Sequence, residues 1–529
     1  MKKFLFVTAL VACAAMLVSV SFAQDASKRI APLARVHADA TERTQEQMDA
    51  YEATHPVVQE AIAPFRPTMG DTEYRMLKAG LDAQAKTAAG NKAQSFQSPV
   101  PLHGVTGATK YTGGDSSGNA SLGQPHWVPP DTEGAIGATQ FVQTANDYIN
   151  VYNKAGVLLT HRSLNAFFGA STDTFDPRVT WDALWQRWVV TADSFAVSST
   201  EQDFYWAVSK TNNADGPWYV YKWNTSGITG AGSLWDFPSV ALQQDAMVVT
   251  ANVFGTSSFK GAYLMGIPKA QIYNGRGVYW FVYGGLWATL QPSKVLPNDE
   301  TGIDWLAAAA NGGIEMYALE NPGTESTEVL AGPYAVTGVP AYSAPPSAVQ
   351  PAPCGGGTNA LDTSDARFVN IGTQYGDLLY QVHSYNFVTA TIRYYVISGL
   401  GSFAPTVHET HYFYGDPSAL SDDFNASIAA DTSDNLVITW TSNYSAGYNA
   451  QVRYVGRQHG DPAISGAAGA VLTGSGSCMT ADYDPNFGIQ RWGDYSATTL
   501  DPVTAKTFWI INEDIIGGDW GNEIGKVHF

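Results

Sequence analysis

The sequence contains few charged residues, and basic residues are the scarcer kind. Asp, Glu, Lys and Arg make up 15% of the 529 residues, and 29 basic side chains stand against 48 acidic ones, a formal net charge of −19. Soluble domains average about 25% charged residues, and long helices or coiled coils need more. Surfaces that bind nucleic acid need basic residues to displace counterions. The composition therefore disfavours a helix-rich protein and excludes nucleic acid as an expected partner.

Cysteine is also scarce, with three residues and no C-x-x-C pair. Cys13 falls within the first 23 residues, so only Cys354 and Cys478 remain after them. An even pair in an exported protein predicts one disulfide. Two free buried thiols are the alternative.

Long hydrophobic runs are absent after the first 23 residues. Those residues carry Lys2 and Lys3, an apolar run, and the small residues Ser21 and Ala23 before a polar segment, as in a cleaved export signal. We expect a secreted or periplasmic protein with no membrane span after cleavage. The segment ending at Cys13 resembles a lipobox, so lipoprotein anchoring is the alternative.

Residues 24–100 differ in composition from the rest of the chain. They contain no Trp, whereas all 15 Trp lie between Trp127 and Trp520. They are also almost neutral, so the acidic excess belongs to residues 101–529. Capping residues and helix formers around residues 44–51 and 71–78 predict a helical or partly disordered N-terminal extension.

Residues 101–529 are predicted to form an all-β domain. Short β-branched and aromatic runs alternate with Asn, Asp, Gly and Pro, and a strand–turn–strand unit recurs about every 61 residues, enough for four short strands. This spacing predicts a β-propeller, seven-bladed, with six blades as the alternative because the fourth unit is weak. We expect the last strand, at residues 523–529, to close the ring against an early strand.

Three motifs support this fold by resemblance. They are Pro-Pro-Asp-Thr-Glu-Gly-Ala-Ile-Gly at residues 129–137, Asp-Pro-Arg-Val at 176–179 with Arg-Trp at 187–188, and Arg-Trp-Gly-Asp-Tyr-Ser-Ala at 491–497 with Phe-Trp at 508–509 and Trp-Gly at 520–521. Together they resemble a group of exported, mostly uncharacterised bacterial β-propeller proteins. The resemblance covers about residues 126–529 and implies fold and export, but no reaction.

Several short patterns fail as catalytic or metal motifs. Gly-Asp-Ser-Ser-Gly at residues 114–118 matches G-x-S-x-G but lacks the flanking strand and helix of a nucleophile elbow. His408 and His411 are three apart on a predicted strand, so they point to opposite faces. Asp431 and Asp434 belong to a polar turn that we expect to be capped by its own side chains. We expect no cofactor or metal, with a weak Ca²⁺ site on these oxygens as the alternative.

Charged side chains recur where the innermost strands of the blades should begin. In a propeller these strands line the central channel, so the charges should gather at one mouth of it. Asp236, Asp304 and Asp422 share this placement. The candidate ligand-binding residues are Asp131, Glu133, Asp176, Arg178, Asp365, Arg367, Asp423, Arg491 and Asp494. Such a pocket could bind a sugar, an anion or a cation, and two carboxylates could hydrolyse a glycoside. Alternatively, the same residues hold neighbouring blades together.

These observations favour an extracellular or periplasmic recognition module with a glycan or a protein as its ligand.

 We expect the protein to act as a monomer, and glycan is the favoured ligand. A polysaccharide hydrolase or lyase at the channel mouth is the first alternative, and a structural or protein-interaction propeller is the second. Trp127, Trp218, Trp235, Trp287 and Trp520 lie in loop-like sequence, where their rings could form exposed platforms for sugars.

Overall fold

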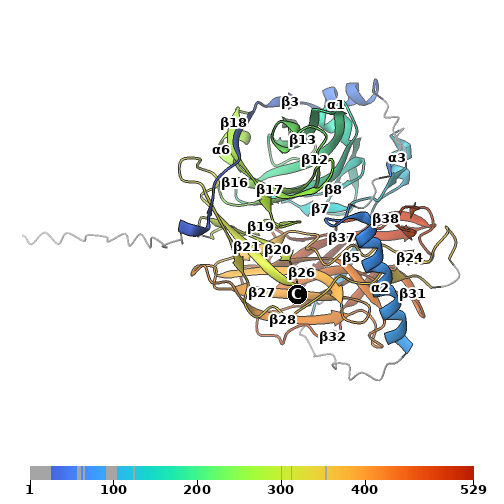
Figure 1. Ribbon diagram of the computed structural model, residues 1–529. Helices are drawn as coiled ribbons and strands as arrows, with labels where there is room; N and C mark the ends of the chain where they lie inside the picture. Colours follow the sequence, from blue (N-terminus) through green and yellow to red (C-terminus); the bar gives the residue numbers. More distant parts are fainter. Residues whose placement is uncertain are drawn as a thin grey trace, which may run out of the picture.

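The computed structural model describes residues 26–55, 61–62, 66–90, 104–105, 107–122, 126–299, 301–310, 312–351 and 354–529. Within these ranges, antiparallel sheets follow one another along the chain (Figure 1). The predicted export signal with Cys13, and the predicted boundary near residues 97–101, lie outside the described residues. No helix in the described ranges is long and apolar enough to span a membrane.

The chain is an all-β propeller, as predicted, and its main sheets appear in chain order. The first sheet has β7 (Glu133–Ile136), β8 (Gln140–Ala145), β9 (Tyr148–Asn153) and β10 (Leu158–Ser163). The second has β11 (Thr174–Asp182), β12 (Arg187–Ser198), β13 (Glu201–Ser209) and β14 (Trp218–Asn224). The third has β15 (Leu234–Leu242), β16 (Ala246–Phe254), β17 (Phe259–Pro268) and β18 (Val278–Leu286), and the fourth has β20 (Ile303–Ala310), β21 (Gly313–Glu320) and β22 (Val329–Ala335).

Three further large sheets complete the series. The fifth runs from β19 (Ser293–Val295) through β25 (Gly372–Tyr375), β26 (Leu378–Asn386), β27 (Ala390–Ser398) and β28 (Thr406–Tyr414) to β32 (Gly466–Ala467). The sixth has β29 (Asp422–Ala430), β30 (Leu436–Tyr444), β31 (Tyr448–Arg457) and β33 (Ala470–Gly474). The seventh has β36 (Ala497–Leu500), β37 (Thr507–Ile516), β38 (Asp519–His528) and the early strand β5 (Gly107–Asp115).

The innermost strands form a closed circuit of contacts. β7 packs on β11, β11 on β15, β15 on β19, β19 on β25, β25 on β29, β29 on β36, and β36 returns to β7. β19 therefore occupies the place in the circuit that β20 would be expected to fill, although it pairs with β25 of the next sheet. This displacement explains why the fourth repeat is weak in the sequence.

Each sheet is buried on both faces because it packs against two neighbours. All six residues of β8 and all nine of β11 are buried, so apolar and polar residues do not simply alternate along them, and both strands carry buried polar side chains such as Gln143 and Arg178. Aromatic rings fill the space between sheets, as where Trp206 of β13 meets Trp280 of β18. This packing accounts for the high Trp content.

The ring closes as predicted, through the C-terminal strand. β38 pairs antiparallel with β5, with Ile524 opposite Tyr111 and Val527 opposite Ala108. An early strand and the last strand therefore share one sheet, which fastens the two parts of the chain together.

In its described residues, the N-terminal extension contains the two predicted helices and also short strands that were not predicted. Its helices are α1 (Gln45–Glu52), with the predicted cap at Thr44, and α2 (Asp71–Gly90). Ahead of them, the short 3-10 helix η1 (Ala26–Lys28) leads into strands that join the outer edges of three sheets. These are β1 (Arg29–Ile30) on β22, β2 (Ala34–Ala38) on β18 and β3 (Thr41–Arg43) on β14. Free sheet edges accept any strand of suitable length, and so short a polar segment gives no strand signal of its own.

The predicted disulfide between Cys354 and Cys478 is present. It lies beside a small sheet of β23 (Ala348–Val349), β24 (Ala360–Leu361), β35 (Ile489–Gln490) and β34 (Tyr483–Asp484). The remaining elements are the pair β4 (Ala61–Ile62) and β6 (Trp127–Val128), and the short helices α3 (Ser117–Ser121), α4 (Leu164–Phe168), α5 (Ser226–Thr229) and α6 (Lys269–Ile272).

Candidate functional site

The inner strands begin with a repeated irregularity. The register shifts near the start of β11, β15 and β29, and each shift contains a residue with positive φ: Asp176 at 50°, Phe237 at 56° and Asn425 at 51°. A β-bulge of this kind redirects the side chains around it. The bulges gather charged side chains at the amino ends of the inner strands.

We call the cluster of charged residues at the amino ends of the inner strands the capped mouth. Its members share positions at or just before the start of inner strands, and their charges act on one another or on α2. They are Asp131, Asp176, Asp236, Asp365, Arg367, Asp422, Arg491 and Asp494. The sequence placed these residues together correctly, although whether they bind a ligand stays a prediction.

The carboxylates Asp131 and Asp176 already have protein donors. Asp131 accepts hydrogen bonds from the Asp494 backbone N–H at 2.7 Å and from Asn146 Nδ2 at 2.7 Å. Asp176 accepts one from the Tyr495 hydroxyl at 2.6 Å and one from the Phe237 N–H. Both side chains therefore join neighbouring sheets.

The arginines are paired as well. Arg367 binds Asp365 through two hydrogen bonds of 2.9 Å. Arg491 binds Asp362, which sequence reasoning missed, and lies 3.5 Å from Asp494. Burial and the charge of Asp176 raise the pKa of Asp494, while Arg491 opposes this shift.

Helix α2 covers this end of the channel. Tyr74, Lys78 and Leu81 lie along its buried face, with the spacing of successive helical turns. Lys78 Nζ donates hydrogen bonds to the Pro345 carbonyl at 2.9 Å, the Thr363 hydroxyl at 2.8 Å and the Ser364 carbonyl at 3.0 Å. Figure 1 shows α2, in blue, lying over the orange and red sheets.

Arg66 adds a second cation from the extension. Its Nε lies 3.6 Å from Asp236, whose pKa is raised by burial and by the charge of Asp176. The only signal for this cover in the sequence is the stripe of Tyr74, Lys78 and Leu81 at helical spacing, which was not among our sequence-based predictions. Nothing in the sequence indicates which surface such a stripe contacts.

Two of the charged residues expected at the channel mouth, Asp423 and Asp304, lie elsewhere. Asp423 is fully buried and accepts hydrogen bonds from Gly415 N–H, Ser421 and the Trp440 indole, so it joins two sheets and does not line the mouth. Asp304 is fully buried beside β19 and accepts the Ser293 N–H. Both residues occupy the repeated position in the sequence, but in the fourth and sixth units that position lies inside the protein.

The polar turn at Asp431 is capped as predicted. Asp431 accepts the backbone N–H groups of Ser433 and Asn435, and Asp434 pairs with Arg457 at 3.0 Å. These oxygens are committed to protein donors.

The predicted aromatic platforms are largely wrong. Trp127, Trp218, Trp235 and Trp520 are fully buried, and Trp287 is half-buried. The indole of Trp520 donates to the Trp127 carbonyl, and that of Trp218 to the Ala214 carbonyl. Loop-like flanking sequence did not reveal that these rings pack between sheets.

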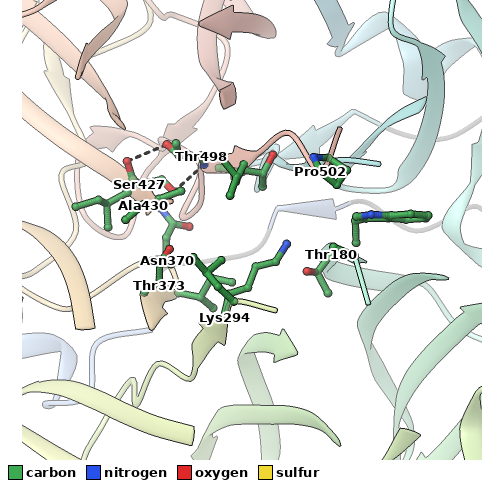
Figure 2. Close-up of a pocket in the computed structure, with 18 of the residues that line it drawn as sticks. Thr180, Lys294, Asn370, Thr373, Ser427, Ala430, Thr498 and Pro502 are labelled. Atoms are coloured by element: carbon green, nitrogen blue, oxygen red, sulfur yellow. Dashed lines mark hydrogen bonds between the residues drawn. The ribbon is translucent and has the colours of Figure 1, made fainter. Parts of the chain in front are cut away.

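A second region lies farther along the inner strands, and we call it the channel cavity. It has a volume of about 250 Å³ and reaches residues at or beyond the carboxyl ends of these strands, including Ala183, Thr432 and Pro502. Figure 2 shows side chains from several sheets converging on it. Small apolar and hydroxyl side chains form most of its wall.

Besides Arg178, the cavity wall carries a second cation, Lys294 of β19. Figure 2 shows its side chain extending toward Thr180. No described residue accepts a hydrogen bond from Lys294 Nζ, and no described residue is hydrogen-bonded to the hydroxyl of Thr180 or Thr373 in the same wall. Burial lowers the pKa of Lys294 to about 8, against the opposing charge of Asp182.

The acidic groups of the cavity are paired. Glu133 binds Arg178 at 2.8 Å, and burial raises the Glu133 pKa while Arg178 opposes the shift. Asp501 binds Lys154 at 2.9 Å and the Trp509 indole at 3.1 Å. Glu133 and Arg178, both predicted site residues, therefore belong to the cavity wall and not to the capped mouth.

Comparison with known proteins finds no matching family model and no matching curated protein. Among solved structures, a Trypanosoma rangeli sialidase in complex with sialic acid matches at 10% identity and a TM-score of 0.37, over 72% of this chain and 57% of the sialidase. A Penicillium chrysogenum alpha-L-arabinanase complexed with arabinobiose matches at 11% identity and 0.33, over 66% and 98%. The Dos1 propeller matches at 10% and 0.36, over 74% of each chain. This chain thus spans little more than half of the sialidase. Similarity at these identities and TM-scores says nothing about activity.

Proposed function

We propose that this protein is an exported recognition module, a seven-bladed propeller whose channel cavity binds a glycan unit that bears a carboxylate. The observation that carries the proposal is the set of Lys294, Thr180 and Thr373, which face one cavity without a described protein partner. An ammonium group pairs with a carboxylate, and threonine hydroxyls exchange hydrogen bonds with sugar hydroxyls. The disulfide fits an oxidising compartment.

The size of the cavity supports a small ligand unit. Small-molecule pockets usually start at about 300 Å³, so a volume of about 250 Å³ suits one sugar ring at the end of a chain. The apolar wall residues offer contact to the faces of such a ring.

Hydrolysis is the alternative, and the cavity supports it less well. Glycoside hydrolases use two carboxylates, one of them with a raised pKa. Glu133 has a raised pKa, but the second carboxylate of the wall, Asp501, is held by Lys154 and Trp509. Binding without bond cleavage therefore fits these residues better.

The test is a glycan array probed with the full mature chain, followed by titration of the best acidic glycan. Lys294→Met should weaken binding at least tenfold, about 1.4 kcal/mol, while Lys222→Met on the outer strand β14 should leave it unchanged. Binding should also weaken as the pH rises above about 8, because Lys294 then loses its proton.

A blank array would contradict glycan recognition and leave the protein-interaction alternative. Equal binding by Lys294→Met would show that the cavity is not the site. Release of reducing sugar from an acidic polysaccharide would establish the hydrolase alternative instead.

A further inference from the structure

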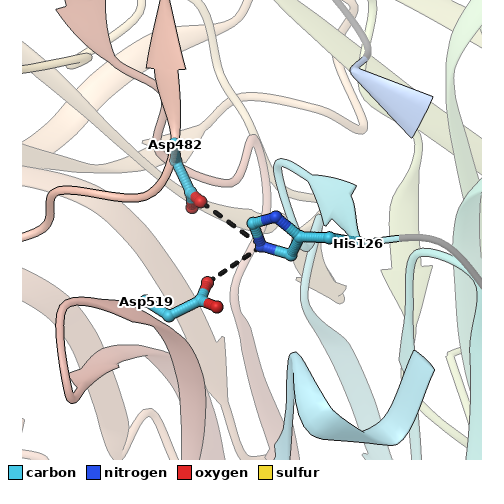
Figure 3. Close-up of side chains that lie close together, drawn as sticks. All are labelled: His126, Asp482 and Asp519. Atoms are coloured by element: carbon cyan, nitrogen blue, oxygen red, sulfur yellow. Dashed lines mark hydrogen bonds and ion pairs between the residues drawn. The ribbon is translucent and has the colours of Figure 1, made fainter. Parts of the chain in front are cut away.

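Three side chains that the proposed function does not use converge near the starts of β6, β34 and β38 (Figure 3). His126 lies just before β6, Asp482 just before β34, and Asp519 begins β38. His126 Nε2 lies 2.9 Å from Asp519 Oδ1 and 3.5 Å from Asp482 Oδ1. One ligand atom from each residue lies within 4.8 Å of the other two.

Asp482 is the group that needs explanation. Its residue is 1% exposed, and neither carboxylate oxygen accepts a hydrogen bond from a described residue. Both oxygens of so deeply buried a carboxylate normally have partners, because an unpaired buried charge is costly. Figure 3 shows this carboxylate directed toward the imidazole of His126.

The backbone around the cluster is held firmly. The N–H groups of Thr480 and Ala481 donate to the Gly518 carbonyl, so the loop carrying Asp482 is tied to the turn before Asp519. The Cys354–Cys478 disulfide anchors the same loop. The Trp520 indole donates to the Trp127 carbonyl, which joins the residues adjacent to Asp519 and His126.

Asp519 is oriented by its own hydrogen bonds. Ser116 Oγ donates to Oδ2 at 2.7 Å, and the Trp520 N–H donates to Oδ1 at 2.8 Å. Carboxylates that ligate metals are typically held by such outer hydrogen bonds.

We propose that His126, Asp482 and Asp519 bind one divalent transition-metal ion of the Zn²⁺ class. One imidazole nitrogen and two carboxylate oxygens form a donor set that Zn²⁺ accepts, with a fourth tetrahedral position for water. A site of carboxylates alone would favour Ca²⁺ instead. The ligands come from segments far apart in the chain, so the ion would fasten the ring where its first and last parts meet.

The test uses the full mature chain stripped of metal and titrated calorimetrically with ZnCl₂. We expect one Zn²⁺ per chain and a rise in the thermal unfolding midpoint. His126→Ala should weaken Zn²⁺ affinity at least tenfold and remove the thermal shift, and because His126 is partly exposed this variant should fold. Co²⁺ should give the visible absorption of a tetrahedral site.

The matched control is His459→Ala, which removes an exposed histidine that lies 3.2 Å from a single carboxylate, Asp434. It should bind Zn²⁺ like the parent chain. Asp482→Asn should weaken binding as His126→Ala does. Absence of Zn²⁺ binding, equal affinity in His126→Ala, or Ca²⁺ binding of equal strength would overturn the proposal and leave a protonated His126 between two carboxylates.

Discussion

The two ends of the channel use polar residues in opposite ways. At the capped mouth, charges are numerous, and Asp131, Asp176 and Arg367 are bound to other protein groups. In the channel cavity charges are few, but Lys294 faces the space without a described partner. The density of charged residues therefore marks where the sheets are joined, and an unpaired charge marks where a ligand can bind.

The largest expected effect concerns Arg491, which joins Asp362 and Asp494 at the capped mouth. Arg491→Met leaves Asp362 as a buried charge without its partner, which should lower the free energy of unfolding by about 3–5 kcal/mol. Urea denaturation followed by Trp fluorescence measures this change. Lys294→Met, at the other end, should lose ligand binding with little loss of stability.

The control for this variant is Arg35→Met, which breaks the exposed ion pair with Glu325. Such an exposed pair contributes little to stability, because solvent and salt screen its charges. If Arg491→Met destabilised the protein no more than Arg35→Met does, the capped mouth would not be a structural network.

The sequence predicted the fold because propeller repeats are local. Each unit carries its own strands and turns, and the spacing of Ala135, Val179, Val240 and Ile428 reports their recurrence. The repeat also predicted the position of most charged residues of the capped mouth, because these residues occupy fixed positions in the repeat. Strands β1 to β3 escaped prediction because their pairing depends on distant sheet edges.

The candidate site was harder to predict for a physical reason. Whether a carboxylate is free depends on donors that the local sequence does not reveal. Tyr495 and the Phe237 N–H, which bond to Asp176, lie in or next to other sheets, and Asn146, which bonds to Asp131, lies 15 residues further along the chain. Lys294 had no signal of its own, because a single lysine in a weak repeat resembles any surface lysine.

The second prediction concerns pH and Asp422, which lies at the start of β29 beneath α2. Burial raises its pKa to about 8, while the N–H groups of Val349 and Ala390 oppose the shift. The folded protein therefore holds this proton more tightly than the unfolded chain does. The free energy of unfolding should fall as pH rises from about 5 to about 8, by at most about 1.4 kcal/mol per pH unit for one proton.

Asp422→Asn removes this titration, so its unfolding free energy should depend less steeply on pH than that of the parent chain. Urea denaturation at several pH values gives both slopes. Parallel slopes would show that Asp422 does not hold its proton in the folded state, and would weaken the view of the mouth as a closed environment.

The smallest expected effect tests whether the cap acts only at its own end. Lys78→Met keeps the aliphatic stem on α2 but removes three hydrogen bonds, to Pro345, Thr363 and Ser364. Contact of α2 with the mouth should weaken by about 1–3 kcal/mol, and limited proteolysis should cut within residues 71–90 faster. Global unfolding should change little, because the sheets stay paired.

The matched control is Lys86→Met, on the same helix but exposed. It should leave the cleavage rate unchanged. Glycan affinity should also be unchanged in Lys78→Met, because Lys294 and its hydroxyl neighbours lie toward the other end of the channel. If loosening α2 instead raised glycan affinity, the ligand would enter through the capped mouth, and the extension would regulate binding by covering it.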